Sequence, residues 1–321
     1  MYKRILLAVD DDIAVDTIAA QAERMAGISG GSIKLLHVVQ EPIESMNHAA
    51  SARSLSGGVK KGESLFARIG ERLRRDGIAC EQQLSEVIGI SVAQEIVRQA
   101  DEWRAELVVM GTHGRRGLRR LLLGSTAESV ARITPVPVLL VRCESDDMNS
   151  SSRAAYSRVL VPVDASEPSL AGLEQALSYA RQTGALVKVV HVSNLLAKDG
   201  SAVPSVAYEP LLIEARKNAN EVLAAARAVA HERGLVIDTE LIEIAGGSLA
   251  QPILDAARFW KADLIVMGTH GYRGVRRLTM GSDAADILRV SPLPVLLTRQ
   301  DGEFIPAVAD VSNGPSVSPE I

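Results

Sequence analysis

The chain has 321 residues, enough for about two domains, and its 47% hydrophobic and 23% charged residues exclude a fibrous or wholly disordered protein. The net charge of −4 and the 3% of aromatic residues argue against a general nucleic-acid binder, which needs positive charge and rings for base stacking. Two cysteines, Cys80 and Cys143, are too few for a disulfide framework or a four-cysteine metal site, so we expect a reducing compartment.

No apolar run approaches the ~18 residues of a membrane-spanning helix. The run from Ile5 to Val9 ends at three aspartates and is too short for the apolar region of a secretion signal. We therefore expect a cytoplasmic protein without membrane insertion.

Apolar runs and helically spaced apolar residues alternate along the first half of the chain, which predicts buried strands and amphipathic helices. The expected strands are 4–10, 32–39, 79–87, 106–111 and 137–142, and the expected helices are 14–27, 60–76, 91–103 and 125–133. The second half repeats this series, with strands at 158–164, 186–192, 236–244, 263–268 and 294–299 and helices at 167–183, 209–233, 248–260 and 282–290. This alternation predicts two α/β domains, each a doubly wound five-stranded parallel sheet covered by helices on both faces. Ligands of such sheets bind beyond the carboxyl ends of the strands.

The two halves are copies of one another. Residues 111–125 read GTHGRRGLRRLLLGS and residues 268–282 read GTHGYRGVRRLTMGS, with 11 of 15 positions identical. A period of about 157 residues indicates a duplicated domain rather than a solenoid. The expected division is a first domain at 1–143, a linker at 144–155, a second domain at 156–300 and a disordered tail at 301–321.

Each copy carries the spacing Gly-x2-Gly-x9-Gly-Ser between a strand and a helix. Glycines let backbone amides approach an anion, and the helix start adds positive potential. Arginines lie between the glycines: Arg115, Arg116, Arg119 and Arg120 in the first copy, and Arg273, Arg276 and Arg277 in the second. This pattern predicts a phosphate cradle in each domain. The alternative is a structural turn in which Ser125 caps the helix together with Glu128 and the arginines face solvent.

These features resemble a tandem universal stress protein, the two-domain form of that family. The glycine motif resembles the family's ATP-binding signature, and the likeness extends to an Asp after each first strand and to an apolar-His-Val end of each second strand. The resemblance implies an adenine-nucleotide α-hydrolase-like fold and ATP as ligand, with Mg²⁺ as an optional companion. It also implies domains that pair through their fifth strands as an intramolecular pseudo-dimer, with homodimers of the whole chain as a further option.

The resemblance also implies roles for individual residues. Asp10 and Asp164 would contact the adenosine part, and Val38 and Val192 would hold adenine through their backbone. The ribose and phosphates would be held by Gly111, Gly114, Gly124 and Ser125 in the first copy and by Gly268, Gly271, Gly281 and Ser282 in the second. Beyond the resemblance, Arg115 and Thr126 are further candidate binding residues in the first copy.

Several of these polar residues have structural alternatives. Asp10 and Asp164 could instead cap the helix that follows. We expect His37 and His191 to be core histidines, whereas His113 and His270, in the glycine loops, could touch phosphate or fix the loop. No second His or Cys lies at metal-ligand spacing, so no metal site is predicted.

The two copies differ in charge near the motif. The second keeps the family's Pro-x-Asp-x-Ser at 162–166, where the first has Asp11 and Asp12. The second also places Asp283 where the first has Thr126, so we expect the first site to bind nucleotide more tightly.

We therefore expect an ATP-binding stress-response or regulatory protein in which nucleotide occupancy changes conformation or partners. The motif is not accompanied by a water-activating residue or a nucleophile–base pair, so fast catalysis is not predicted. Two alternatives stay open: a slow ATPase or phosphotransferase that uses His113 or His270, and a nucleotide-free scaffold.

Overall fold

The computed structural model describes residues 1–10, 15–41, 49–112, 123–142, 154–194, 205–269 and 280–299. The first half contains β1 (Arg4–Ala8), α1 (Val15–Ser29), β2 (Ser32–Glu41), α2 (Ala49–Arg75), β3 (Cys80–Ile88), α3 (Val92–Glu102), β4 (Leu107–Gly111), α4 (Ser125–Ile133) and β5 (Val138–Val141). The second half contains β6 (Arg158–Pro162), α5 (Glu167–Thr183), β7 (Leu186–Asn194), α6 (Ser205–Glu232), β8 (Asp238–Ile244), α7 (Ala250–Trp260), β9 (Leu264–Gly268), α8 (Ser282–Val290) and β10 (Val295–Thr298). The described helices include none that is long and apolar enough to cross a bilayer.

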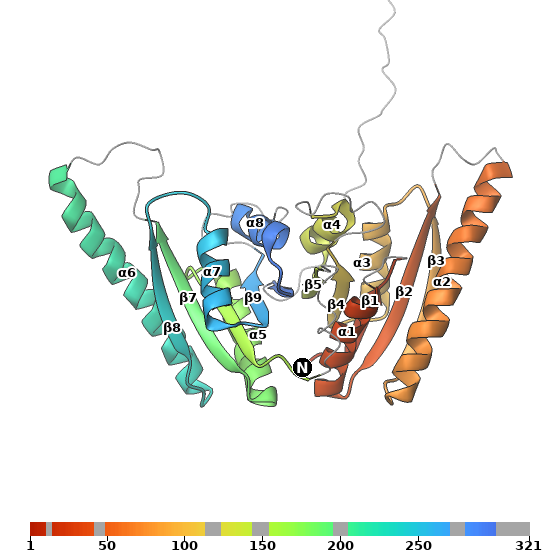
Figure 1. Cartoon of the computed structure of the whole chain (residues 1–321), viewed down its shortest axis with the longest axis horizontal. Coiled ribbons are helices and arrows are strands. Elements are labelled where there is room, and N and C mark those ends of the chain that lie inside the picture. Colours follow the sequence, from red (N-terminus) through yellow and green to blue (C-terminus); the bar gives the residue numbers. More distant parts are fainter. Residues whose placement is uncertain are drawn as a thin grey trace, which may run out of the picture.

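All ten strands form one sheet in the order β3-β2-β1-β4-β5-β10-β9-β6-β7-β8. Neighbouring strands are parallel within each half. The predicted fold class, two tandem doubly wound α/β domains with helices on both faces, is confirmed (Figure 1). Because the strand order reverses between β1 and β4, and again between β6 and β9, each domain has a switch point of the kind at which such sheets bind ligands.

The halves meet where β5 pairs antiparallel with β10, with Leu139 opposite Leu296. Both strands are wholly buried. A short apolar strand at the edge of a sheet would leave backbone groups unpaired and apolar side chains exposed. Pairing the two fifth strands covers both edges at once.

The apolar core forms two layers, one on each face of the sheet, and each layer runs through both halves. One layer lies under α1, α2, α5 and α6 and includes Ile18, Leu73 and Leu173. The other lies under α3, α4, α7 and α8 and includes Ile96 and Ile287. The central strands, such as β1, β4, β6 and β9, are therefore buried on both faces, which fits their almost continuous apolar sequences. The edge strands β3 and β8 carry exposed polar residues.

Two reciprocal hydrogen bonds join the halves on the α1/α5 face. The Tyr2 hydroxyl donates to Gln175 Oε1 at 3.0 Å, and the Tyr156 hydroxyl donates to Gln21 Oε1 at 2.5 Å. Tyr2 and Gln21 each lie 154 residues before Tyr156 and Gln175, so the two bonds are equivalent. The guanidinium of Arg24 lies 4.3 Å above the centre of the Tyr156 ring. Among the described contacts, the Tyr2 ring has no equivalent cation above it.

Helix α2 begins earlier than the periodicity predicts, at Ala49 rather than residue 60. Glycines inside the helix obscure its pattern because glycine is a poor helix former. Two of them face β2: a Cβ on Gly58 would lie 2.8 Å from Val39 Cγ1, and one on Gly62 would lie 2.8 Å from His37 Cδ2. These glycines therefore let the helix approach the sheet closely.

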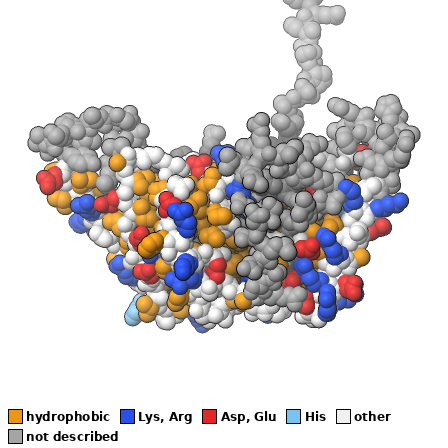
Figure 2. Space-filling model, viewed as in Figure 1, with side chains coloured by type: hydrophobic (Ala, Val, Ile, Leu, Met, Phe, Trp, Pro, Cys, Tyr) orange, Lys and Arg blue, Asp and Glu red, His pale blue; other side chains and the backbone are white. Residues whose placement is uncertain are grey.

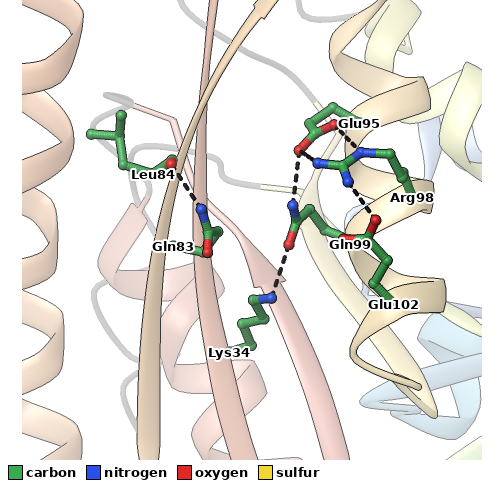
Figure 3. A network of polar contacts seen from close by, with 7 residues as sticks. All are labelled: Lys34, Gln83, Leu84, Glu95, Arg98, Gln99 and Glu102. Carbon is green, nitrogen blue, oxygen red and sulfur yellow. Dashed lines mark hydrogen bonds and ion pairs between the residues drawn. The ribbon is translucent and has the colours of Figure 1, made fainter.

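Helix α3 is tied to the sheet by a polar network that centres on the buried carboxylate of Glu95 (Figure 3). Arg98 donates to both of its oxygens, from Nε at 2.7 Å and from Nη2 at 2.6 Å, and also to Glu102 at 2.5 Å. Gln99 donates to Glu95 Oε1 at 3.0 Å and accepts from Lys34 Nζ at 2.8 Å. Burial alone would raise the pKa of Glu95, but hydrogen bonds from Arg98, Gln99 and Ser85 outweigh it and lower that pKa.

Helix α7 lacks this network, because Pro252, Asp255, Ala256 and Phe259 stand at the positions of Glu95, Arg98, Gln99 and Glu102. Phe259 is 90% exposed. Figure 2 shows hydrophobic side chains among charged ones on the face of the second domain that carries α7 and α8. The equivalent surfaces of the two domains have therefore diverged.

We predict that Glu95→Gln lowers the free energy of unfolding by about 2 kcal/mol at pH 7, because an amide cannot keep the charge-assisted bonds to Arg98. Since the folded pKa of Glu95 is lowered, this stabilisation is present above the ordinary pKa of a glutamate. It is lost as the pH falls through the lowered value. The difference in the free energy of unfolding between wild type and variant, measured by urea denaturation, should therefore be smaller at pH 3 than at pH 7.

Glu102→Gln is the matched control for this prediction. Its carboxylate binds the same arginine but is exposed, so its loss should cost about 0.5 kcal/mol or less. If Glu95→Gln lowers the free energy of unfolding equally at both pH values, the effect does not come from the charge of the Glu95 carboxylate.

Candidate functional site

Two of the predicted residues, Asp10 and Val38, lie beside each other where β1 ends, next to the carboxyl end of β4 at the predicted residue Gly111. Ala8 pairs with Leu36 and Leu7 pairs with Val109. Continuing both registers along the chain places Asp10 level with Val38 on one side and with Thr112 on the other. A hydrogen bond from the Val9 amide to the Leu36 carbonyl, at 2.9 Å, continues the first register beyond β1.

The second domain repeats this arrangement. Pro162 pairs with Val190, and Leu160 pairs with Ile265. The same extension places Asp164 level with Val192 and with Thr269. In each domain, an aspartate, the valine beside it in the second strand and the start of the glycine loop therefore lie together at the switch point of the sheet.

Each glycine loop is closed at its base by hydrogen bonds. In the first domain, the Thr112 amide donates to the Val141 carbonyl at 3.0 Å and the Gly124 amide donates to the Thr112 carbonyl at 2.8 Å. In the second, Thr269 donates to Thr298 at 3.1 Å and Gly281 donates to Thr269 at 3.0 Å. The loop thus starts and ends at one point of the sheet. The predicted residues Gly114, Arg115, His113, Gly271 and His270 lie outside the described residues.

The helix that follows each loop begins with a glycine in the N-cap position. Gly124 and Gly281 have extended backbone angles, and neither has a side chain that could accept from the first-turn amides. The alternative in which Ser125 caps the helix together with Glu128 is therefore wrong in this detail, because Ser125 is the first residue inside α4 rather than its cap. Because a glycine cap has no side chain to bind the first-turn amides, these amides and the positive potential of the helix start stay available for an anion.

Thr126 and Asp283 occupy the second position of these helices, in α4 and α8. A carboxylate in the first turn suits the helix dipole but also repels a phosphate there. The charge difference expected between the two sites is thus present at the helix starts themselves.

Asp164 braces the helix start in the second domain without being its cap. The N-cap of α5 is Ser166, whose hydroxyl accepts from the Ser169 amide at 3.3 Å. Asp164 Oδ1 accepts from the Ser166 amide at 3.1 Å and from its hydroxyl at 2.5 Å. Ala165 between them has a left-handed φ of 64°. A strained residue and two hydrogen bonds thus fix the carboxylate at the strand end. The equivalent residues 11–14 are outside the described residues.

Two histidines hold the strand ends that carry the aspartates, a role that the sequence did not reveal. His37 Nδ1 lies 2.9 Å from the Val9 carbonyl, and His191 Nδ1 lies 2.8 Å from the Val163 carbonyl. His37 is buried, as expected of a core histidine, whereas His191 is half-buried. The equal separation of 27 residues between each aspartate and its histidine was the available signal.

Gly268 has a packing role in addition to its place in the motif. A Cβ on Gly268 would lie 2.5 Å from the carbonyl of Pro168, at the start of α5. One on Gly172 would lie 3.3 Å from the Gly268 amide nitrogen. Ile18 stands at the position of Gly172 in the first domain. The floor under the glycine loop is therefore built differently in the two domains.

The site consists of backbone amides, carbonyls and one carboxylate rather than of a metal-ligand cluster. Across the described part of the chain, no group of three or more His, Cys, Asp or Glu residues could hold a metal ion. Such an arrangement can bind a ligand with hydroxyl groups at the strand ends and a negative charge at the helix start.

The family of the chain follows from comparison with known proteins. The model of the universal stress protein family matches residues 1–142 and again residues 155–299. A universal stress protein of Methanocaldococcus jannaschii is 32% identical over 146 residues, which cover 45% of this chain and 83% of that protein. One from Mycobacterium tuberculosis is 23% identical over 300 residues, which cover 92% of this chain and 97% of its relative.

A solved structure supports the fold over nearly the full length. The crystal structure of a universal stress protein from Archaeoglobus fulgidus has a TM-score of 0.67 at 20% identity, over 92% of this chain and 98% of that one. Both halves match the family model, and the two halves form tandem domains of the same fold. The chain therefore belongs to the universal stress protein family.

Proposed function

We propose that the protein is an ATP-binding regulatory protein of the stress response, with one nucleotide site in each domain. The observation that carries this proposal is the glycine-capped start of α4 and of α8, each beside the carboxyl ends of three parallel strands. Such a helix start suits phosphate, and the neighbouring strand ends suit the sugar and base. Nucleotide occupancy would change the conformation of the loops or the choice of partner.

The residues at each site have distinct tasks in this proposal. The carboxylate of Asp10, and that of Asp164 in the second domain, accepts a hydrogen bond from a ribose hydroxyl. The backbone at Val38 and Val192 contacts adenine. The phosphates lie at the helix starts, on the amides of Ser125 and Thr126 in the first domain and on those of Ser282 and Asp283 in the second. Gly124 and Gly281, whose own amides donate to the Thr112 and Thr269 carbonyls, let the phosphates approach these helix starts. Gly111, Gly268 and the loop residues Gly114, Arg115 and Gly271 complete the two cradles, with Mg²⁺ accompanying the phosphates when it is bound.

We also propose that the two domains, 1–143 and 156–300, act as a pseudo-dimer in solution, with 144–155 as a linker and 301–321 as a tail. The β5–β10 pairing and the Tyr2–Gln175 and Tyr156–Gln21 hydrogen bonds support this arrangement. The scarcity of cysteine supports a cytoplasmic location.

The proposal is tested by titrating the wild-type chain with ATP in a calorimeter and by mass spectrometry of any nucleotide released from the purified protein. We expect binding in the micromolar to sub-millimolar range. No released nucleotide and no heat of binding would favour a scaffold. Turnover at ordinary enzyme rates that is lost on changing His113 or His270 would favour a phosphotransferase.

We predict that Ser125→Glu abolishes or weakens ATP binding at the first site by about tenfold or more, because its carboxylate would lie among the amides that hold the phosphates. Ser282→Glu should do the same at the second site. Neither change should lower the thermal midpoint, since a glutamate in the first turn suits the helix dipole. Ser125→Ala and Ser282→Ala keep the amides and serve as controls. Equal affinities for the Glu and Ala variants would contradict the placement of phosphate at these helix starts.

We predict that Asp283→Thr strengthens ATP binding at the second site by about fivefold, because it removes a negative charge within one helical turn of the phosphates. The titration is made in the Ser125→Glu background, in which only the second site is intact. The reverse change, Thr126→Asp in the Ser282→Glu background, should weaken the first site by a similar factor. The two single-site backgrounds, without any change at Thr126 or Asp283, provide the comparison. If the second site binds ATP more tightly than the first there, this charge argument is wrong.

A further inference from the structure

Two equivalent arginines cross the seam between the domains. Arg142 directly follows β5, and Arg299 directly follows β10, 157 residues later. Arg142 Nη1 donates to the carbonyl of Arg289 at 2.6 Å, near the end of α8. Arg299 Nη2 donates to the carbonyl of Ala131 at 2.8 Å and also to that of Arg132, near the end of α4. Each domain therefore binds the carboxyl end of a helix that belongs to the other.

The helices bound in this way are those whose opposite ends carry the proposed phosphate sites. Helix α4 starts at the first glycine loop, helix α8 starts at the second, and each has nine residues. The last carbonyls of a helix have no partner within it, and a cation there also suits the negative end of the helix dipole. An arginine that donates to these carbonyls thus fixes one end of the helix while the nucleotide occupies the other.

The same arginines are connected to the loop of their own domain. Arg142 follows Val141, whose carbonyl accepts from Thr112 at the base of the first loop, at 3.0 Å. Arg299 follows Thr298, whose carbonyl accepts from Thr269 at the base of the second loop, at 3.1 Å. These contacts form a closed series that we call the cross-domain ring. The base of the first loop is bonded to the end of β5, Arg142 after β5 binds α8, and α8 starts at the base of the second loop. That base is bonded to the end of β10, Arg299 after β10 binds α4, and α4 starts at the base of the first loop.

We propose that Arg142 and Arg299 are positioning residues, each for the nucleotide site of the opposite domain. This inference rests on the proposed function, because it concerns the same two sites. A helix of nine residues is about 13 Å long, so a tilt of roughly 5° about its carboxyl end would displace its first amides by about 1 Å. A displacement of that size is enough to spoil hydrogen bonds to a bound phosphate.

The ring has a consequence for the two sites together. A nucleotide that draws in the start of α4 also acts on Arg299 and, through Thr298, on the base of the second loop. The reverse path runs from α8 through Arg142 and Val141 to the first loop. Binding at one site should therefore change the affinity of the other, and by thermodynamic linkage the change must be reciprocal.

The test measures each site alone in variants of the full-length chain. ATP is titrated in the Ser282→Glu background, which leaves the first site, and in the Ser125→Glu background, which leaves the second. We expect Arg299→Met to weaken the first site about fivefold and to leave the second within about twofold. Arg142→Met should show the opposite pattern. Arg299→Lys, which keeps a cationic donor, should recover part of the loss.

Arg289→Met is the matched control, because the structure uses the main-chain carbonyl of Arg289 for the cross-domain bond and its side chain binds only Asp286 in its own helix, among the described contacts. It should leave both sites unchanged. This crossed pattern separates positioning from simple destabilisation, which would weaken the variant's own domain first. If Arg299→Met is unfolded at the titration temperature, Arg142→Met decides the outcome alone.

The possible failures are distinguishable from one another. Loss at the arginine's own site, or equal loss at both sites, would overturn the positioning role while leaving nucleotide binding intact. Unchanged affinities in both Met variants would overturn it as well. If wild-type protein and both single-site backgrounds fail to bind ATP, the proposed function is overturned and this inference with it.

Discussion

Each domain of this protein ends in a short apolar strand that its own sheet covers on one side only, and the antiparallel pairing of β5 with β10 supplies the missing neighbour. Four wholly buried residues in each strand make exposure of that edge unfavourable, both for their side chains and for their backbone groups. The pairing fuses two five-stranded sheets into one and lets both core layers run across the seam. It also brings the ends of the fifth strands, which hold the bases of the glycine loops, next to the helices of the opposite domain. The contacts of Arg142 and Arg299 with the helices of the opposite domain therefore depend on this one pairing.

The sequence could predict the architecture because its signals are local and occur twice. Alternating apolar runs and amphipathic helices predicted every described strand and helix, and the starts of α4 and α8 were predicted to the residue from the Gly-Ser pairs at 124–125 and 281–282. The start of α2 was missed because Gly58, just before residue 60, interrupts the helical pattern for a tertiary reason, the close approach of the helix to Val39. The alternative cap of α4 at Ser125 satisfies a local sequence rule, but the structure has Gly124, with extended backbone angles, as the N-cap.

The remaining features could not be predicted because no local pattern encodes them. Tyr2 and Gln175 are separated by 173 positions, and Arg142 and Arg289 by 147. Contacts at such separations depend on how two finished domains are placed, which hydrophobic periodicity does not determine. The bracing histidines are an intermediate case. Their sequence separation from the aspartates is the same in both copies. Only the register of β1 with β2, and of β6 with β7, shows that each imidazole ring reaches the main-chain carbonyl of the residue before the aspartate.

Joining the two copies in one chain relaxes the symmetry that a dimer of identical subunits would impose. In such a dimer a substitution appears on both sides of the interface and in both sites. Here the cross-domain bonds stay reciprocal, since Arg142 and Arg299, and likewise Tyr2 and Tyr156, make equivalent contacts. The surroundings of the sites do not stay equivalent: Asp283 stands in the second copy where the first has Thr126, and Gly172 stands where the first has Ile18. The contacts at the seam thus keep the bases of the two loops connected through equivalent arginines. The two helix starts differ in charge, so in the function that we propose a single chain holds two unequal sites on one continuous sheet.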